Sequence, residues 1–423
     1  DKKDYWKVVD QCYLCDLCYM TKCPYTPPHP WQLDFPHLML RAKAIKHKNG
    51  HVQAKEKFLA STDVHGQFAG IPIVVDIVNK VNGTKAARKL MDSQLGVHPD
   101  AWMPTLAPQR FRWGKALNNP AFTVVNGQRT PGKVAIYSTC YVNYNEPGIG
   151  HDLLKILDHN DIPYVIVDKE QCCGMPKLEL GDLDSVEQSK NANIPVRARY
   201  ARDVFAILSA VPSCTLMFKQ EIPLMFPGEA DVMLVKEAMW DPFEYLGARR
   251  RDGLLKTDFT QPLGKISYQI PCHGRVQNIG KKTEEMLKMV PGTSVHTHER
   301  CSGHAGTFGA ASSSLRPCSA SRRSRLPGRP RPPVWTPEEI RAPMPATSST
   351  WGCPNAMPWH VRQVSMERSR RQFAARPKRR LRSTPASSTK GPCSAIRSAS
   401  CWPRTRSPTP SPSRSRRSTN SAD

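Results

Sequence analysis

Two segments of the chain repeat one order of apolar and polar residues. The first begins with a short buried strand, Lys133 to Ser138, continues through a helix at 151–159 with three leucines on one face, and ends in an apolar strand, Tyr164 to Asp168. A strand, a helix and a second strand in this order predict one βαβ unit of a parallel sheet.

The weaker copy starts at "GKISYQIPCHG", Gly264 to Gly274, has a helix near Lys281 to Met289, and ends in "GTSVHTHERCSGHAGTFG". Between the copies, the apolar residues of Ala201 to Val211 have helical spacing and predict an amphipathic helix that leads into Pro212-Ser213-Cys214. The repeat therefore predicts an α/β fold with two Rossmann-like domains.

The length of 423 residues gives room for two or three domains. The most apolar run, Phe68 to Val78, covers eleven residues, contains Asp76 and is interrupted by Pro72. A membrane-spanning helix needs about 20 apolar residues, so this run is too short to cross a bilayer.

The net charge of +25 suggests nucleic-acid binding, but the charge is distributed unevenly on the two sides of Gly309. Residues 310–423 hold 23 Lys and Arg against 4 Asp and Glu, a net of +19, whereas residues 1–309 carry +6. The tail also has 21 Arg and 2 Lys, compared with 13 Arg and 25 Lys before it. A segment of this composition, without a regular spacing of apolar residues, is predicted to be disordered.

Two interpretations of this tail remain open. It is either a genuine Ser/Arg/Pro tail that binds nucleic acid through phosphate contacts, or the product of a GC-rich gene read in a shifted frame. We favour the frameshift, in which case Cys318, Cys353, Cys393 and Cys401 carry no function. We therefore exclude the tail from the fold and expect no nucleic-acid partner.

The first cysteines, Cys12, Cys15, Cys18 and Cys23, have the spacing C-x2-C-x2-C-x4-C-P. This is close to the ferredoxin run, in which three closely spaced thiolates bind one [4Fe–4S] cube and the fourth ligates a second cube. A zinc knuckle is the alternative, but it pairs two C-x2-C arms across a longer insert. The spacing favours iron–sulfur clusters.

The run needs more thiolates than its surroundings supply. Three cysteines leave one ligand of their cube missing, Cys23 lacks three partners, and the next cysteine is Cys140. We expect the first half of the ferredoxin module upstream of Asp1. The step from Cys18 to Cys23 is one residue longer than usual, which changes the turn but keeps the ligands.

Further cysteines follow the predicted strand ends of both copies. Cys140 and Cys172-Cys173 belong to the first, Cys272 and Cys301 to the second. Ligands collect at the carboxyl ends of parallel strands. We expect a metal site in the first copy, with Cys214 as its fourth ligand.

A lone buried cysteine is usually a small hydrophobic residue, and this remains the alternative for each position. The second copy has fewer thiols but adds His273 and His304. Cys272 and Cys301 predict a second cluster, whereas the two histidines could instead contact substrate or protons.

These motifs resemble the family of iron–sulfur oxidoreductases with paired cysteine-rich (CCG-type) domains. Its branches include the C subunit of anaerobic glycerol-3-phosphate dehydrogenase, the iron–sulfur subunit of glycolate oxidase and heterodisulfide reductase. The resemblance covers Asp1 to Gly309 and is carried by "CYLCDLCYMTKCPY", "EQCCGMP", "PSCTLMFKQE" and "ERCSGHAGTFG".

The resemblance implies four parts of the chain. They are a partial 4Fe-4S ferredoxin-type (α-helical ferredoxin) module at 1–60, a helical linker at 61–130, cysteine-rich domain 1 at 131–245 and a truncated cysteine-rich domain 2 at 246–309. The disordered tail at 310–423, predicted from its composition, follows them. The resemblance also implies that Cys12, Cys15, Cys18 and Cys23 are ferredoxin ligands, and that Cys140, Cys172, Cys173 and Cys214 are ligands in the first cysteine-rich domain. Cys214 lacks the family's C-x-x-C, which favours an ordinary four-thiolate cluster.

The implied function is electron transfer in an oxidoreductase. The chain would accept electrons from a flavin-containing dehydrogenase subunit and pass them to a quinone or another redox carrier. We find no G-x-G-x-x-G after a strand, so no flavin or nucleotide site is predicted in the chain itself. Fourteen cysteines without a preceding signal peptide favour a cytoplasmic protein, with any membrane association peripheral and at the inner face.

Two other functions remain as alternatives. One is a catalytic thiol–disulfide reductase of the heterodisulfide type, in which Cys172 and Cys173 act beside a cluster. The other is nucleic-acid binding through the basic tail.

Overall fold

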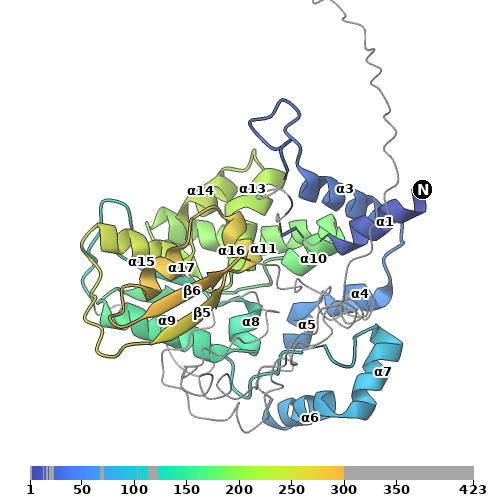
Figure 1. Ribbon diagram of the computed structural model, residues 1–423, viewed down its shortest axis with the longest axis horizontal. Helices are drawn as coiled ribbons and strands as arrows, with labels where there is room; N and C mark the ends of the chain where they lie inside the picture. Colours follow the sequence, from blue (N-terminus) through green and yellow to red (C-terminus); the bar gives the residue numbers. More distant parts are fainter. Residues whose placement is uncertain are drawn as a thin grey trace, which may run out of the picture. The chain divides into compact units, whose positions relative to one another are not determined.

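The computed structural model describes residues 2–299 apart from 13, 16, 17, 19–22, 67–70, 102 and 113–121. The predictions for the tail at 310–423, for Cys301 and for His304 lie outside the described residues. Within them the fold is α/β, with parallel strands in two sheets (Figure 1).

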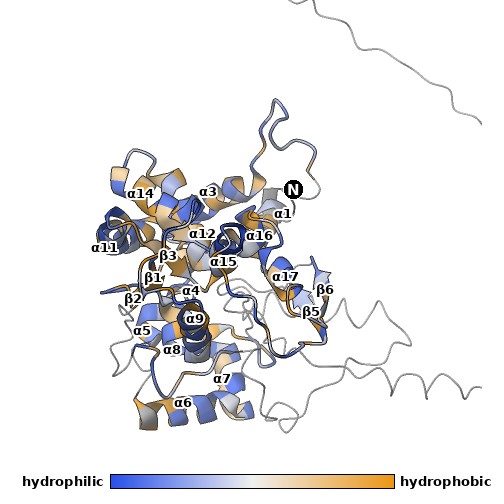
Figure 2. Ribbon diagram, turned by 90° about the vertical axis from the view of Figure 1, so that its left-hand side faces the viewer, coloured by the Kyte–Doolittle hydropathy of each residue, from blue (hydrophilic) through white to orange (hydrophobic). Residues whose placement is uncertain are grey.

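The larger sheet of the described part has four strands in the order β2-β1-β3-β4, with every pair parallel. The strands are β1 (Val134–Tyr137), β2 (Tyr164–Ile166), β3 (Ala206–Ser209) and β4 (Met239–Trp240). Every residue of β1 and β3 is buried, as expected for central strands covered on both faces. Figure 2 shows both strands as hydrophobic, in contrast to the hydrophilic helix α11.

Helices connect these strands and cover the sheet. The βαβ unit predicted from the first repeat is confirmed. Helix α9 (Pro147–His159) lies between β1 and β2 in the sequence and buries its apolar face, and the two strands pair in parallel. The other helices of this part are α8 (Thr139–Tyr144), α10 (Met175–Leu180), α11 (Leu183–Arg202), α12 (Pro212–Leu216), the π-helix η1 (Met217–Glu221), α13 (Ile222–Met225), α14 (Ala230–Ala238) and α15 (Pro242–Arg251).

The helix predicted over Ala201–Val211 is wrong. Helix α11 ends at Arg202, and β3 follows as a central strand of the sheet. A short continuous apolar run satisfies helical spacing and a strand buried on both faces equally well, so its period does not distinguish them.

The second copy forms its own parallel pair. Strand β5 (Lys265–Gln269) pairs with β6 (Ser294–His298), from Lys265 opposite Ser294 to Gln269 opposite His298. Helices α16 (Cys272–Val276) and α17 (Lys282–Leu287) lie between them in the sequence, so the predicted internal repeat is confirmed as a βαβ unit.

The segment before the larger sheet is helical wherever it has regular structure in the described ranges. It contains α1 (Lys2–Gln11), α3 (Phe35–Lys48), α4 (Ala54–Leu59), α5 (Thr62–Gly66), α6 (Pro72–Gly83) and α7 (Lys85–Leu95). None of the helices in the described ranges is long and apolar enough to cross a membrane.

Helix α3 packs directly against α10 (Figure 1). Gly181, which ends α10 with a φ of +79°, lies against the α3 backbone. A Cβ atom at this position would be 2.4 Å from the carbonyl carbon of Lys43. Only glycine permits both this dihedral angle and this approach, so Gly181 fixes the spacing of the two helices.

Candidate metal centre

Three neighbouring strands each deliver cysteines at their carboxyl ends. Cys140 lies in the first turn of α8 after β1, Cys172 and Cys173 follow β2, and Cys214 lies in α12 after β3. Because parallel neighbours end at one edge of the sheet, the four residues converge there. The described cysteines are all free thiols.

The four thiols of the strand ends, Cys140, Cys172, Cys173 and Cys214, form a row that we call the thiol row. The Cys172 thiol lies close enough to those of Cys140 and Cys173 to shift their pKa values and its own, and the Cys173 thiol is coupled in the same way to that of Cys214. Cys172 and Cys173 are each 2 % exposed and Cys214 is 4 % exposed. The structure thus brings together the four residues predicted to share one site.

Hydrogen bonds prepare Cys172 as the thiolate of this row. Bonds from Cys140 and then Cys173 lower the pKa of the Cys172 thiol well below its usual range, with further bonds from Thr62 and the Gly174 N–H. The bond to Cys172 raises the pKa of Cys140, and likewise that of Cys173. One anion in the row is therefore stabilised by the protons of its neighbours.

Helix α5 supplies two contacts to Cys172 that the sequence did not predict. Thr62 Oγ1 donates to Cys172 Sγ over 3.2 Å, and both oxygens of Asp63 accept the Cys172 N–H at 3.2 Å. Burial raises the pKa of Asp63, and the Cys172 charge raises it further. The Thr-Asp pair signals a helix start in the sequence, but nothing there indicates which loop it faces.

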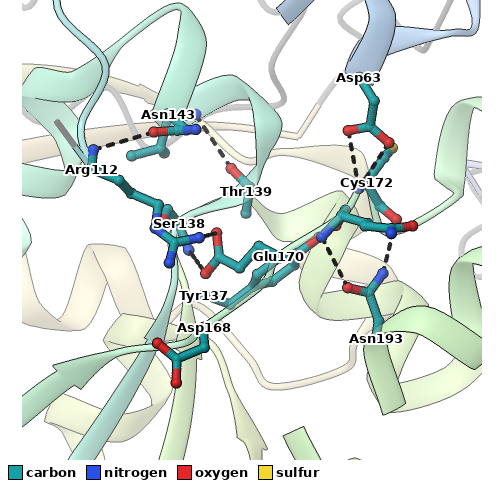
Figure 3. Close-up of polar contacts among 12 residues, drawn as sticks. Asp63, Arg112, Tyr137, Ser138, Thr139, Asn143, Asp168, Glu170, Cys172 and Asn193 are labelled. Carbon is teal, nitrogen blue, oxygen red and sulfur yellow. Dashed lines mark hydrogen bonds and ion pairs between the residues drawn. The ribbon is translucent and has the colours of Figure 1, made fainter. Parts of the chain in front are cut away.

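Asn193 of α11 holds the backbone of the loop that bears Cys172 (Figure 3). Its Nδ2 donates to the Cys172 carbonyl over 3.0 Å, and its Oδ1 accepts the Gln171 N–H over 3.2 Å. The hydroxyl of Tyr137 donates to the Gln171 carbonyl over 2.8 Å. Side chains from two elements therefore fix the position of the cysteine pair.

A cavity of 570 Å³ borders one end of the thiol row. Cys140 and Cys172 line it together with polar residues from several elements, including Asp63, Arg110, Arg112 and Glu170. Arg112 Nη1 lies 3.6 Å from Glu170 Oε2, and Glu170 Oε1 accepts the Ser138 N–H over 2.7 Å (Figure 3). Two of the four sulfurs are thus reached from a polar cavity.

The donor set of the thiol row fits a soft metal centre. Four cysteine sulfurs suit an iron–sulfur cluster or zinc, and a ligating thiol must be deprotonated, as Cys172 is prepared to be. No group of three or more described His, Cys, Asp or Glu side chains already has metal-binding positions. The four cysteines lie at one edge of the sheet, but their side chains do not yet surround a common metal position. The ligand assignment stays a prediction.

Cys12, the first of the N-terminal cysteines, contacts α3. Cys12 follows α1, and the Cys23 N–H donates to the Cys18 carbonyl over 3.1 Å. Lys43 of α3 donates to the Cys12 carbonyl and, over 3.1 Å, to the carbonyl of Glu179 in α10. The ligand roles of Cys12, Cys15, Cys18 and Cys23 stay predictions, but one lysine joins their segment to the helix that follows the cysteine pair.

Cys272 lies close to the helix that bears Cys214. It begins α16 after β5 and is 7 % exposed. His273 Nδ1 is 2.8 Å from the Ser213 hydroxyl, and α16 packs against α12. The helix that bears Cys272 thus packs against the helix that bears Cys214. The role of Cys272 in binding a cluster stays a prediction.

Comparisons with known proteins identify a matching domain family and several relatives. Residues 134–219 match the CCG cysteine-rich domain family. The C subunit of anaerobic glycerol-3-phosphate dehydrogenase from Escherichia coli is 26% identical over 276 residues, which are 64% of this chain and 66% of that protein. The chain thus spans less than two thirds of this relative.

Two archaeal proteins match shorter stretches. An uncharacterized iron-sulfur protein of Methanocaldococcus jannaschii is 27% identical over 41% of this chain and 32% of its own length. The B subunit of a fumarate reductase (CoM/CoB) of Methanothermobacter marburgensis is 26% identical over 43% of this chain and 34% of its own length. No solved structure is significantly similar. The chain therefore contains a CCG cysteine-rich domain and is homologous to subunits of iron–sulfur oxidoreductases.

Proposed function

We propose that the chain is an iron–sulfur electron-transfer subunit of an oxidoreductase. It accepts electrons from a flavin-containing dehydrogenase subunit and passes them to a quinone or another carrier. The observation that carries this proposal is the thiol row, in which four free cysteines from three neighbouring strand ends converge closely enough to shift one another's pKa. Free thiols gathered without a disulfide are typical of a metal or redox site.

In this proposal, Cys140, Cys172, Cys173 and Cys214 hold a [4Fe–4S] cluster. A bound cluster supplies one-electron chemistry at this place. The protein supplies the ligands, buries Cys172, Cys173 and Cys214 at the edge of the sheet, and donates the Thr62 hydroxyl to Cys172. Hydrogen bonds to cluster sulfurs and burial set the reduction potential.

The N-terminal cysteines form the second redox module in this proposal. Cys12, Cys15, Cys18 and Cys23 are ligands of ferredoxin-type [4Fe–4S] clusters. The close packing of α3 on α10 and the two bonds of Lys43 support a direct electron route between the modules. The relatives named as subunits of a dehydrogenase and of a reductase support a multi-subunit setting.

A second candidate function is reduction of a small disulfide. It is favoured by the 570 Å³ cavity, which opens on Cys140 and on the thiolate-prone Cys172. Cys172 would attack a substrate disulfide in the cavity and release one thiolate, and an adjacent thiol would release the second and leave a protein disulfide. Two electrons from an electron donor would then reduce that disulfide. Activity with a small disulfide in the presence of an electron donor would favour this function over electron transfer alone.

The proposed function is tested by anaerobic reconstitution with iron and sulfide, followed by iron analysis and EPR of the reduced protein. Serine substitutions at Cys140, Cys172, Cys173 and Cys214 together should remove one cluster's iron and one EPR signal. The matched control is Cys353→Ser in the tail, which should change neither. Full iron and an unchanged EPR spectrum in the fourfold variant would rule out the proposed cluster.

A further inference from the structure

Arg197 is fully buried in the core of the larger sheet. This residue of α11 is 0 % exposed. Its guanidinium carbon lies 3.9 Å from the centre of the Tyr137 ring and 4.5 Å from that of Phe218. The aromatic faces attract the cation but do not neutralise it, and burying a charge without an anion is unfavourable.

The hydrogen bonds of Arg197 go to uncharged groups. Nη1 donates to the backbone carbonyl of Asn193 over 2.9 Å and to its Oδ1 over 2.8 Å. Within the described residues, Nε and Nη2 make no hydrogen bond. A buried guanidinium whose donors are partly unused requires an explanation.

The thiol row lies within two contacts of this cation. Asn193, which accepts from Arg197, also donates to the Cys172 carbonyl over 3.0 Å. Tyr137 gives a second link: its ring faces Arg197 at 3.9 Å, and its hydroxyl donates over 2.8 Å to the carbonyl of Gln171, the residue before Cys172. The cation and the sulfurs therefore share one low-dielectric region.

The nearby carboxyl group of Glu170 does not fully supply the missing anion. Its Oε1 accepts the Ser138 N–H over 2.7 Å, and among the described residues no hydrogen bond or ion pair joins it to Arg197. Arg112 also approaches Glu170 within 3.6 Å and competes for any charge on it. The thiol row is the remaining group near Arg197 that gains negative charge when it binds a cluster.

We propose that Arg197 is the buried counter-charge of the thiol row and raises the reduction potential of the cluster held there. This inference rests on the proposed function. The charge of four thiolates exceeds the positive charge of a cubane core, so the centre is an anion, and each added electron makes it more negative. A fixed cation nearby stabilises the reduced state more than the oxidised state. Arg197 is thus a positioning residue that acts through space and through Asn193.

The test separates the effect of the Arg197 charge on the reduction potential from the effect of its packing, and it uses the full-length chain. Arg197→Gln removes the charge but keeps an amide that can donate to Asn193, whereas Arg197→Lys keeps the charge without the planar fork. The potential of the reconstituted centre is measured by an EPR-monitored redox titration. It should fall in Arg197→Gln and return most of the way in Arg197→Lys.

Arg249 provides a matched control. It is also buried, at 3 % exposed, but lies on α15 and donates to the Val125 carbonyl over 2.6 Å. Arg249→Gln should lower the thermal stability and leave the potential unchanged. An equal shift in both variants would mean that any buried-arginine loss disturbs the centre, and would overturn the proposal.

A second variant keeps the proposal testable if Arg197→Gln does not fold. Asn193→Asp retains the acceptor for Arg197 and adds an anion beside it, so the potential should fall although Arg197 is intact. An unchanged potential in Asn193→Asp or in a folded Arg197→Gln would overturn the role of Arg197. If the native chain shows no EPR signal that depends on the thiol row, the proposed function itself fails.

Discussion

His37 Nε2 lies 3.0 Å from Oε2 of Glu221, a buried carboxylate 184 residues later in the chain. The other ring nitrogen, Nδ1, lies 2.7 Å from Asp34 Oδ2. The hydrogen bonds to Asp34 and then to Glu221 raise the pKa of His37 to about 10. A protonated histidine between two carboxylates therefore ties α3 to the π-helix of the cysteine-rich domain.

This contact predicts that the attachment of α3 weakens in alkali. The raised pKa means that the stabilisation is complete below pH 6.5 and is lost as the pH rises towards about 10. We expect a loss of roughly 1–2 kcal/mol, because the side chain is partly exposed. Hydrogen exchange of α3 backbone amides at pH 6.5 and pH 10 measures this loss.

The control for His37 is an exposed histidine pair. His37→Gln should make α3 exchange fast at both pH values, whereas His159→Gln, which removes an exposed contact to Asp258, should leave the native difference intact. A native difference that survives in His37→Gln would assign the pH dependence to another group.

Gly181→Ala should loosen the packing of α3 on α10. The new Cβ would lie 2.4 Å from the Lys43 carbonyl carbon and 2.5 Å from the Ala44 nitrogen, and the φ of +79° is also unfavourable for alanine. We expect a loss of about 2–4 kcal/mol in the free energy of unfolding, measured by urea denaturation.

Gly253→Ala separates the two causes of this loss. Gly253 has a φ of +72°, but no atom lies within 4 Å of the position that a Cβ would take there. It should therefore show the cost of the dihedral angle alone, about 1 kcal/mol. Equal losses in the two variants would show that the approach of α3 does not constrain Gly181.

Thr62→Val should reduce the reactivity of Cys172 in the cluster-free chain. The hydroxyl that donates to Cys172 Sγ over 3.2 Å stabilises its thiolate, and valine has the same shape without the donor. The pH at which Cys172 alkylation by iodoacetamide reaches half its maximal rate, followed by mass spectrometry, should rise. Thr62→Ser keeps the hydroxyl and should keep the native midpoint; a raised midpoint in the serine variant would point to lost packing.

Leu208→Ala should strongly destabilise the larger sheet. Leu208 is 0 % exposed in the central strand β3, so its removal leaves a cavity that costs about 2–5 kcal/mol. The control, Leu224→Ala, changes a side chain that is 59 % exposed and should cost less than about 0.5 kcal/mol. Similar losses from both would contradict the burial of β3.

Local patterns predicted the first repeat well, because each strand and helix there has its own period and is next to its partner in sequence. The unit β1-α9-β2 and the convergence of Cys140 with Cys172 follow directly from the order of those elements. The pattern failed at β3, where burial on both faces erases the alternation that identifies a strand.

The supporting residues of the site could not be predicted in the same way. Thr62 and Asp63 reach Cys172 from 110 and 109 residues away, and His37 reaches Glu221 across 184. Contacts at such separations depend on the tertiary arrangement and leave no local period. Arg197 occupies a helix position where an arginine is ordinarily expected to be solvent-exposed, and the fold instead buries it.

The glycine at the end of α10 has a further consequence for electron tunnelling. Tunnelling rates fall exponentially with distance, so a thicker layer between two redox groups slows transfer steeply. At Gly181 the layer between α10 and α3 has no side chain at all, and backbone meets backbone. If both modules carry clusters as proposed, this residue acts as the thinnest spacer that a polypeptide can provide, and the gap it sets cannot be tuned by exchanging one side chain for another.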